Sequence, residues 1–335
     1  MQDAFDPGIA CARAAVAALL AVVAGCGGGG SGDAPPPPPQ TSALFVVNAR
    51  TGDIAGFPTL PPPTGSTTSG HTLAALTSVD GPVAYDAVHD LLYVATTPPE
   101  TQTDDSAQIR VFEHASNLAA GAMPARSIAL EDSLYVQGMA VDGASDTLWV
   151  FYRYLVFTTI DDAIIRRVTS ASVATSSVDF VLTLGHWTEA AAYDPVRDVV
   201  YATDGSGIVV LSQASTSQYW PVAPKQEFGS GIDGVALTSD SSRDIVYIAD
   251  GAGSGVWVML GASTATPTLV GPVPMPTAPT AISVDMANDR LYVSAGGSVY
   301  ALDHASALTA QTLLALPTIS GSASDRYWFS GATIR

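Results

Sequence analysis

The chain has little lysine and a deficit of positive charge. It contains 335 residues, of which 13 are Lys or Arg and 31 are Asp or Glu, and Lys225 is the one lysine. The formal net charge of −18 makes the surface anionic, which argues against a nucleic-acid partner because phosphate backbones are repelled. Charged residues make up only 13% of the chain and hydrophobic residues 47%, so we expect a sizeable core rather than a disordered chain.

Cysteine is equally scarce, and its placement indicates export. The chain has two cysteines, Cys11 and Cys26, and an apolar run from residue 14 leads up to the second. That run is too short to span a bilayer but suits the hydrophobic part of a secretory signal. The last four residues, "VAGC", resemble a bacterial lipobox, in which the cysteine is acylated and becomes the mature N-terminus. We expect residues 1–25 to be a lipoprotein signal peptide, the alternative being an ordinary cleaved signal.

The next segment is typical of a tether. Residues 26–41 pass from a glycine run into a polyproline run, which at roughly 3.1 Å per residue would hold a domain up to about 40 Å from a membrane. We therefore expect a lipid-anchored protein of the bacterial cell envelope, in the outer membrane, with residues 42–335 as its folded domain. One cysteine would remain after cleavage, which excludes a disulfide framework and a cysteine-based metal site.

One phrase recurs five times: an Asp, three residues, a second Asp, two residues, then Tyr or Trp. The copies begin at Asp86, Asp142, Asp194, Asp240 and Asp285. The aromatics, Tyr93, Trp149, Tyr201, Tyr247 and Tyr292, are 56, 52, 46 and 45 residues apart. Each interval holds about four strand-like segments, which predicts a β-propeller whose blades have four antiparallel strands, here called A to D outward from the axis.

The ends of the chain predict how the ring closes. A segment from Ala43 is typical of strands B and C without a preceding strand A, whereas the last residues, "SGATIR", are typical of a strand A with nothing after it. We therefore predict an all-β, six-bladed propeller closed by the C-terminal strand, which also protects exposed sheet edges. Seven blades are the alternative.

The repeated Asp pairs have a structural and a catalytic interpretation. Two carboxylates can act as acid and base, but a reaction needs one such pair, not five. A tight A–B turn needs side-chain acceptors for its backbone NH groups in every blade, and Asp supplies them. We therefore expect turn residues here, and also at His114 and His304, which occupy equivalent places in "EHAS" and "DHAS".

The pattern of strand A, Asp, turn and "LYVA" resembles the NHL and YVTN-type propeller repeats of bacterial exported proteins. The resemblance covers residues 43 to 335. It implies a six- or seven-bladed ring that presents a binding surface, and it carries little information about the ligand because propellers host many activities.

Candidate binding residues are those that the repeat does not explain. The B–C and D–A loops of a propeller share one face, and an acidic and aromatic rim there suits a cation, a sugar or a basic peptide. The candidates are Tyr152, Tyr154, His186, Glu189, Asp204, Asp233 and Asp250.

The chain has no HExxH, GxSxG or Walker motif. We therefore expect a membrane-tethered scaffold that binds a protein, a peptide or a small molecule, and not an enzyme. The alternative is a Ca²⁺-dependent lactonase or esterase of the gluconolactonase kind, with Glu189, Asp233 and Asp250 as oxygen ligands. The arrangement of the oxygen ligands distinguishes the two functions. The hydrolase needs three or four of them around one point in the channel, whereas the scaffold needs none.

Overall fold

The computed structural model describes most of the region expected to fold. The described residues are 43–48, 53–58, 71–75, 81–96, 107–118, 121–130, 134–154, 162–183, 190–203, 207–216, 226–229, 231–253, 255–312, 319–320 and 327–331. The chain divides into Met1–Pro38 and Pro39–Arg335, and all of these residues belong to the second unit. The predicted signal peptide, the predicted tether and Cys26 lie outside the described residues.

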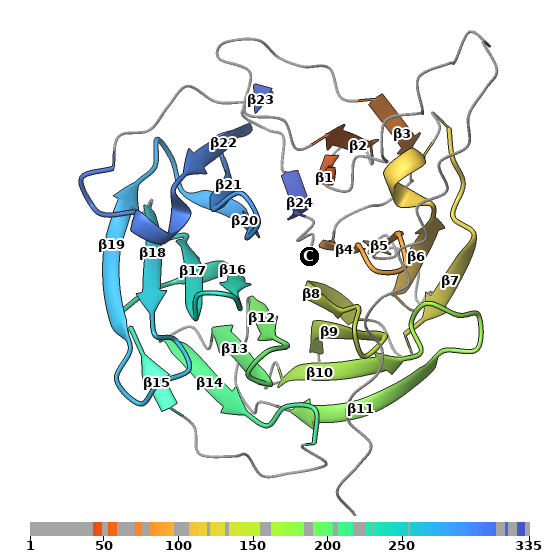
Figure 1. The fold of residues 1–335 in the computed structure, drawn as a ribbon, viewed down its shortest axis with the longest axis horizontal. Coiled ribbons are helices and arrows are strands. Elements are labelled where there is room, and N and C mark those ends of the chain that lie inside the picture. The colour runs from red at the N-terminus through yellow and green to blue at the C-terminus, as the bar shows by residue number, and fades with distance from the viewer. Residues whose placement is uncertain are drawn as a thin grey trace, which may run out of the picture. The chain divides into compact units, whose positions relative to one another are not determined.

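The described strands form six four-stranded antiparallel sheets (Figure 1). The first contains β24 (Tyr327–Gly331), β1 (Ala43–Asn48), β2 (Asp53–Pro58) and β3 (His71–Ala75). The second contains β4 (Val83–Asp86), β5 (Leu91–Thr96), β6 (Gln108–Glu113) and β7 (Arg126–Ala129). The third contains β8 (Leu134–Asp142), β9 (Thr147–Tyr154), β10 (Asp162–Thr169) and β11 (Ser177–Thr183).

The remaining three sheets have the same layout. The fourth contains β12 (Ala191–Asp194), β13 (Val199–Thr203), β14 (Ile208–Ser212) and β15 (Gln226–Phe228). The fifth contains β16 (Gly234–Asp240), β17 (Ile245–Asp250), β18 (Gly255–Leu260) and β19 (Thr268–Pro274). The sixth contains β20 (Pro279–Asp285), β21 (Arg290–Ala295), β22 (Ser298–Asp303) and β23 (Ile319–Ser320).

The innermost strands of these sheets surround one axis. Strand β4 contacts β8, and the contacts continue through β12, β16, β20 and β24 back to β4. Figure 1 shows the sheets arranged radially around this centre, with the strands of each sheet following one another outward. The prediction of an all-β propeller is confirmed. No helix among the described residues has the length and hydropathy needed to cross a bilayer.

The two ends of the described chain meet in the first sheet, as the sequence predicted. Strand β24 pairs antiparallel with β1, so that Asn48 lies opposite Tyr327 and Leu44 opposite Gly331. The closing strand begins earlier than predicted, at Tyr327 instead of Ser330, and residues 332–335 lie outside the described residues. An aromatic run, "YWFS", forms most of it, in line with the preference of aromatic side chains for strands.

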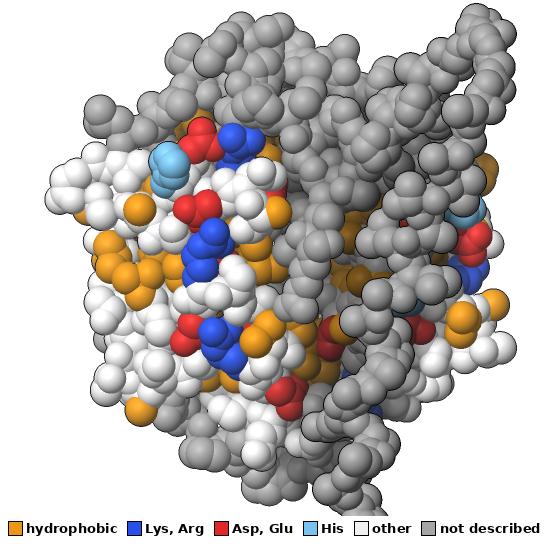
Figure 2. Space-filling model, in the orientation of Figure 1, with side chains coloured by type: hydrophobic (Ala, Val, Ile, Leu, Met, Phe, Trp, Pro, Cys, Tyr) orange, Lys and Arg blue, Asp and Glu red, His pale blue; other side chains and the backbone are white. Residues whose placement is uncertain are grey.

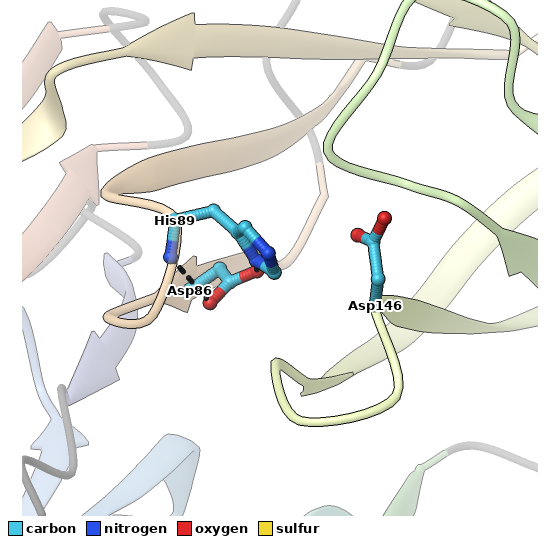
Figure 3. Close-up of side chains that lie close together, drawn as sticks. All are labelled: Asp86, His89 and Asp146. Carbon is cyan, nitrogen blue, oxygen red and sulfur yellow. Dashed lines mark hydrogen bonds and ion pairs between the residues drawn. The ribbon is translucent and has the colours of Figure 1, made fainter.

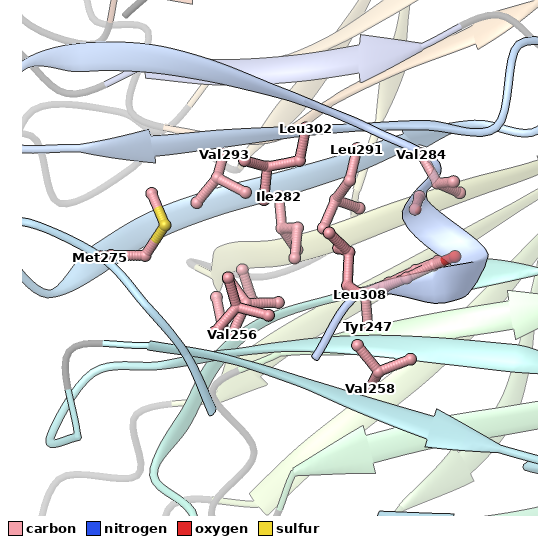
Figure 4. Packing of buried hydrophobic residues seen from close by; sticks show 14 of the residues in the cluster. Tyr247, Val256, Val258, Met275, Ile282, Val284, Leu291, Val293, Leu302 and Leu308 are labelled. Carbon is pink, nitrogen blue, oxygen red and sulfur yellow. The ribbon is translucent and has the colours of Figure 1, made fainter. Parts of the chain in front are cut away.

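Apolar side chains fill the spaces between neighbouring sheets. The cluster in Figure 4 joins the fifth sheet, through Tyr247, Val256 and Val258, to the sixth sheet, through Val284 and Leu291. The repeated aromatics occupy this layer in equivalent interfaces, where Tyr93, Trp149, Tyr201 and Tyr247 are at most 1% exposed. The expectation that these residues pack between blades is therefore confirmed at four interfaces.

The first Asp of each repeat ends strand A and caps the turn to strand B. In the fourth sheet, Asp194 Oδ1 accepts hydrogen bonds from the backbone NH groups of Val196 (2.9 Å) and Arg197 (3.2 Å). The same side-chain acceptance occurs at Asp86, Asp142, Asp240 and Asp285. The structural interpretation of these carboxylates is confirmed.

The second Asp ties the A–B turn to the C–D turn of the same sheet. Asp198 has a φ of 56°, in the left-handed region that Asp tolerates better than most residues. Its carboxylate accepts from the backbone NH and the Oγ of Ser215, both at 2.8 Å, and its carbonyl accepts from the NH of Ala214. Four other sheets repeat this tie, which explains why Ala-Ser recurs with the Asp pair. His114 and His304 directly precede Ala-Ser and are left-handed turn residues, as predicted.

Candidate functional site

A cavity of about 900 Å³ lies among the inner strands β4, β8, β12, β16 and β20 and the turns that follow them. Small side chains make the middle of each of these strands narrow enough to leave this space open. One lining residue from each strand illustrates the pattern: Ala84, Ala140, Ala192, Thr238 and Ser283. Such a concave site, mostly apolar with a few hydroxyl groups, is typical of small-molecule binding.

The described carboxylates that line this cavity, Asp86 and Asp142, already have hydrogen-bond partners. Asp86 accepts from the NH groups of Val88 and His89 and lies 2.7 Å from the ring of His89. Asp142 accepts from the NH groups of Ala144 and Ser145 and from the Ser145 hydroxyl. Both carboxylates therefore maintain turns, and neither is poised as a free general base.

Two of the predicted site residues, Asp233 and Asp250, lie close together at the opposite edge of the fifth sheet. The Asp233 carbonyl accepts from the NH of Gly251 at 2.8 Å, just after β17 ends at Asp250. Asp250 is 5% exposed, and its carboxylate accepts from Ala252 N, Gly253 N and Trp257 Nε1 at 3.1, 2.9 and 3.1 Å. Asp250 thus shapes the β17–β18 hairpin, while the Asp233 side chain is partly exposed beside it.

The described part of the structure does not place the other predicted residues beside Asp233 and Asp250. Tyr152 and Tyr154 belong to the end of β9, opposite Ile164 and Asp162 of β10, but their side chains are outside the described part. His186, Glu189 and Asp204 are outside it altogether. The predicted binding set therefore stays a prediction.

The structure reveals a site that the sequence analysis missed, between the A–B turns of the second and third sheets. Asp86 and His89 come from the turn after β4, and Asp146 comes from the next sheet's turn, after β8 (Figure 3). One ligand-type atom from each residue lies within 4.8 Å of the others. Among the residues that the structure describes, this is the one convergence of three potential metal ligands.

Arginine occupies the equivalent position at two other interfaces. Arg197 Nη1 donates to Asp194 (3.0 Å) and to the Ser241 carbonyl of the next sheet (2.6 Å), while its Nε lies 3.4 Å from Asp244. Burial opposes the charge of Arg197, but the hydrogen bond to Asp194 and the neighbouring carboxylates raise its pKa overall. At this interface a cation is held between Asp residues of two neighbouring sheets, an arrangement called a clasp below.

The fifth and sixth sheets repeat this clasp. Arg243 Nη1 donates to Asp240 (2.6 Å) and to the Met286 carbonyl (3.1 Å), and it lies 4.0 Å from Asp289. The hydrogen bond to Asp240 raises the pKa of Arg243. The face drawn in Figure 2 shows such basic patches directly beside acidic ones. The shared position is the third residue after the first Asp of each repeat, a signal present in the aligned repeats.

Buried tyrosine hydroxyls lie beneath these interfaces. Tyr93, Tyr201 and Tyr247 are fully buried, and their Oη atoms have no hydrogen-bond partner. Burial raises the pKa of each phenol, and the charges of nearby carboxylates raise it further: Asp86 and Asp146 for Tyr93, Asp194 and Asp244 for Tyr201. The hydroxyls are therefore neutral and face pairs of carboxylates from two sheets.

Comparison with known proteins agrees with the fold. No protein-family model matches the chain. No functionally curated protein matches it in sequence. Among solved structures, a nidogen/laminin complex matches with a TM-score of 0.60 and 16% identity, over 87% of this chain and 98% of that one.

Two bacterial structures are also similar. A putative 6-phosphogluconolactonase from Bacteroides uniformis has a TM-score of 0.52 and 10% identity, over 82% of this chain and 81% of that one. A gluconolactonase from Xanthomonas campestris has a TM-score of 0.50 and 14% identity, over 78% of this chain and 87% of that one. At such identities the likeness concerns the fold alone, so the class that fold and comparison define is the β-propeller proteins.

Proposed function

We propose that this chain is a binding propeller and that its ligand occupies the cavity among the inner strands. The observation that carries the proposal is the combination of a 900 Å³ cavity with lining carboxylates, Asp86 and Asp142, that are both committed to turns. Its small apolar and hydroxyl-bearing walls suit an uncharged small molecule or the side chain of a partner protein better than a hydrolytic reaction.

A neutral apolar dye, Nile red, tests the cavity directly. Thr238 lines the cavity and is partly exposed, so Thr238→Trp places an indole in it. Thr216→Trp is the matched control, because Thr216 is exposed in a C–D turn that does not line the cavity. We expect the first variant to lose most of the dye fluorescence at an unchanged melting temperature, and the control to keep it. Equal binding by both variants would contradict the proposal.

We further propose that six blades, closed by β24, form the ring, and that residues 26–41 tether it to an envelope membrane through acylated Cys26. The cyclic contacts of the inner strands support the first point, and the lipobox and proline run support the second. Replacing Cys26 with Ser should abolish fatty-acid labelling and release the protein from membranes. Membrane fractionation that persists without the label would end the lipoprotein interpretation.

A Ca²⁺-dependent lactonase is the second candidate, and the gluconolactonase-like neighbours favour it at the level of fold. Asp233 and Asp250 would be among its oxygen ligands, with Glu189 as a third. Hydrolysis of gluconolactone by the full chain, stimulated by Ca²⁺ and lost in Asp233→Asn, would establish this activity. An unchanged background rate with Ca²⁺ present would favour the binding propeller.

A further inference from the structure

The interfaces between sheets differ in what lies between their paired carboxylates. Arg197 fills that place between the fourth and fifth sheets, and Arg243 fills it between the fifth and sixth. His89 fills it between the second and third. The aligned residue in the third sheet is Ser145, which bonds only within its own turn, so no third ligand joins the carboxylates there.

At the histidine interface no guanidinium lies between the paired carboxylates of the described residues. His89 Nδ1 is paired with Asp86 at 2.7 Å, and Asp146 has no ion pair among the described residues. Arg126 of the second sheet also reaches the third sheet, where it donates to the Ala171 carbonyl, but among the described residues it forms no ion pair with Asp86 or Asp146. Among the described residues His89 is paired with Asp86 alone, whereas at the sister interfaces a guanidinium contacts carboxylates of both sheets.

We propose that Asp86, His89 and Asp146 bind a divalent transition-metal ion that clasps the second sheet to the third. The metal would supply the charge that arginine supplies elsewhere, and it would use the imidazole as a ligand instead of a counter-ion. This proposal does not depend on what occupies the central cavity.

The carboxylates are held in position before any ion arrives. Asp146 accepts from Ser172 N and Oγ, both at 2.8 Å, and Asp86 accepts from two backbone NH groups of its own turn. Hydrogen bonds of this kind orient ligands and make a site selective. The His89 side chain is 32% exposed, so the site is open to solvent on one side and the ring is free to adjust.

A buried hydroxyl also faces this site. Tyr93 lies on β5 in the same layer between the two sheets, is fully buried, and has an unpartnered Oη. Burial and the charges of Asp86 and Asp146 raise the pKa of this phenol, and the positive charge of Arg126 opposes the rise. Tyr201 and Tyr247 are unpartnered at the arginine interfaces too, so the hydroxyl belongs to the repeat.

The donor set selects the class of ion. One imidazole nitrogen and two carboxylate oxygens suit Zn²⁺ and its first-row neighbours, whereas Ca²⁺ and Mg²⁺ prefer oxygen alone. Ligand atoms in a tetrahedral zinc site are about 3.3 Å apart, so an ion would replace the 2.7 Å contact between Asp86 and His89 and draw together ligand atoms that now lie up to 4.8 Å apart. Three protein ligands leave a fourth position for water.

The test uses the full chain, stripped with chelator and then titrated with Zn²⁺, Ca²⁺ or Mg²⁺. We expect one Zn²⁺ to bind per chain and the melting temperature to rise by roughly 5 °C at saturating Zn²⁺, with little response to Ca²⁺ or Mg²⁺. His89→Arg recreates the clasp of the sister interfaces, so it should fold, lose at least about 100-fold in Zn²⁺ affinity, and melt near the zinc-loaded wild type without metal. Asp146→Asn should also weaken Zn²⁺ binding, which would show that both sheets contribute ligands.

His114→Asn is the matched control, since it changes an exposed turn histidine away from the site, at a left-handed position that Asn tolerates, and should leave Zn²⁺ binding intact. An unchanged melting temperature of the wild type with Zn²⁺, or an equal rise in His89→Arg, would overturn the proposal.

Discussion

The two edges of the sheets are built differently. At the edge with the A–B and C–D turns, five sheets use the same Asp and Ser hydrogen bonds. At the opposite edge, the two fully or nearly fully described B–C hairpins share no such device. Asp250 caps one hairpin through its carboxylate, whereas Gly296 and Gly297, with φ of 56° and 71°, make the tight turn of the other. The repeated edge therefore stabilises the fold, and the unrepeated edge is free to vary.

The largest expected effect comes from deleting β24, a whole strand that runs from one edge of the first sheet to the other. Ending the chain after Arg326 deletes β24 and exposes the backbone groups of β1. We expect loss of cooperative unfolding, or aggregation, in thermal melts followed by circular dichroism, because an open sheet edge invites pairing with other chains. Deleting residues 27–40 is the control and should leave the melt nearly unchanged. A truncated chain that melts at the wild-type temperature would show that β24 does not close the ring.

The aromatic layer beneath the repeated edge should give the next largest effect. Tyr247→Ala should lower the free energy of unfolding by about 3–5 kcal/mol because it leaves a cavity between two sheets. Tyr247→Phe should be nearly neutral, since the hydroxyl it removes is buried without a partner. Urea unfolding measures both values. Equal losses in the two variants would mean that the hydroxyl, not the ring, stabilises the interface.

The two edges can be compared directly by substituting one Asp at each edge and measuring the free energy of unfolding. Asp198 accepts from Tyr193 Oη, Ser215 N and Ser215 Oγ, so Asp198→Ala should cost about 2–3 kcal/mol, with Asp198→Asn closer to the wild type. Asp233→Asn, at the opposite edge, should change stability by less than about 0.5 kcal/mol. If Asp233→Asn is the more destabilising, the contrast between the edges is wrong.

Alkaline pH should produce the smallest effect. Burial, followed by the charges of Asp240 and Asp289, raises the pKa of Tyr247 above its ordinary value of 10.0. The folded state therefore keeps the phenol proton that the unfolded state releases, so its stabilising contribution is complete below about pH 10 and declines above it. We expect the melting temperature to fall by roughly 5 °C between pH 8 and 11, and less steeply in Tyr247→Phe. A pH-independent melt would contradict the burial of these phenols.

Much of the fold was predictable because the repeated residues act locally. Each first Asp caps its own turn and each aromatic marks one phase of strand B, so the repeats reveal them without any knowledge of the third dimension. The residue at which the closing strand begins was harder to predict. Strand β24 carries none of the Asp residues that mark the other inner strands, and its register is seen in its pairing with β1.

The histidine site was not predicted because its members come from different repeats. Asp146 meets Asp86 and His89 only after two sheets have packed together, and nothing in the spacing of one repeat indicates that contact. The one signal in the sequence is the third residue after the first Asp of each repeat, where His89 occupies the position that is Arg197 or Arg243 in two other repeats. Of the predicted binding residues, Asp233 and Asp250 lie at the edge that does not repeat, so the aligned repeats do not indicate their partners.

The pairing of β1 with β24 also determines how the domain responds to mechanical load. Leu44 near the start of β1 lies opposite Gly331 at the end of β24, so a force that pulls residues 43 and 331 apart acts at the same end of an antiparallel pair. The hydrogen bonds would then break one after another instead of sharing the load. We therefore expect the β1–β24 pair to separate at a lower force when it is pulled from residues 43 and 331 than when the two strands are pulled along their length.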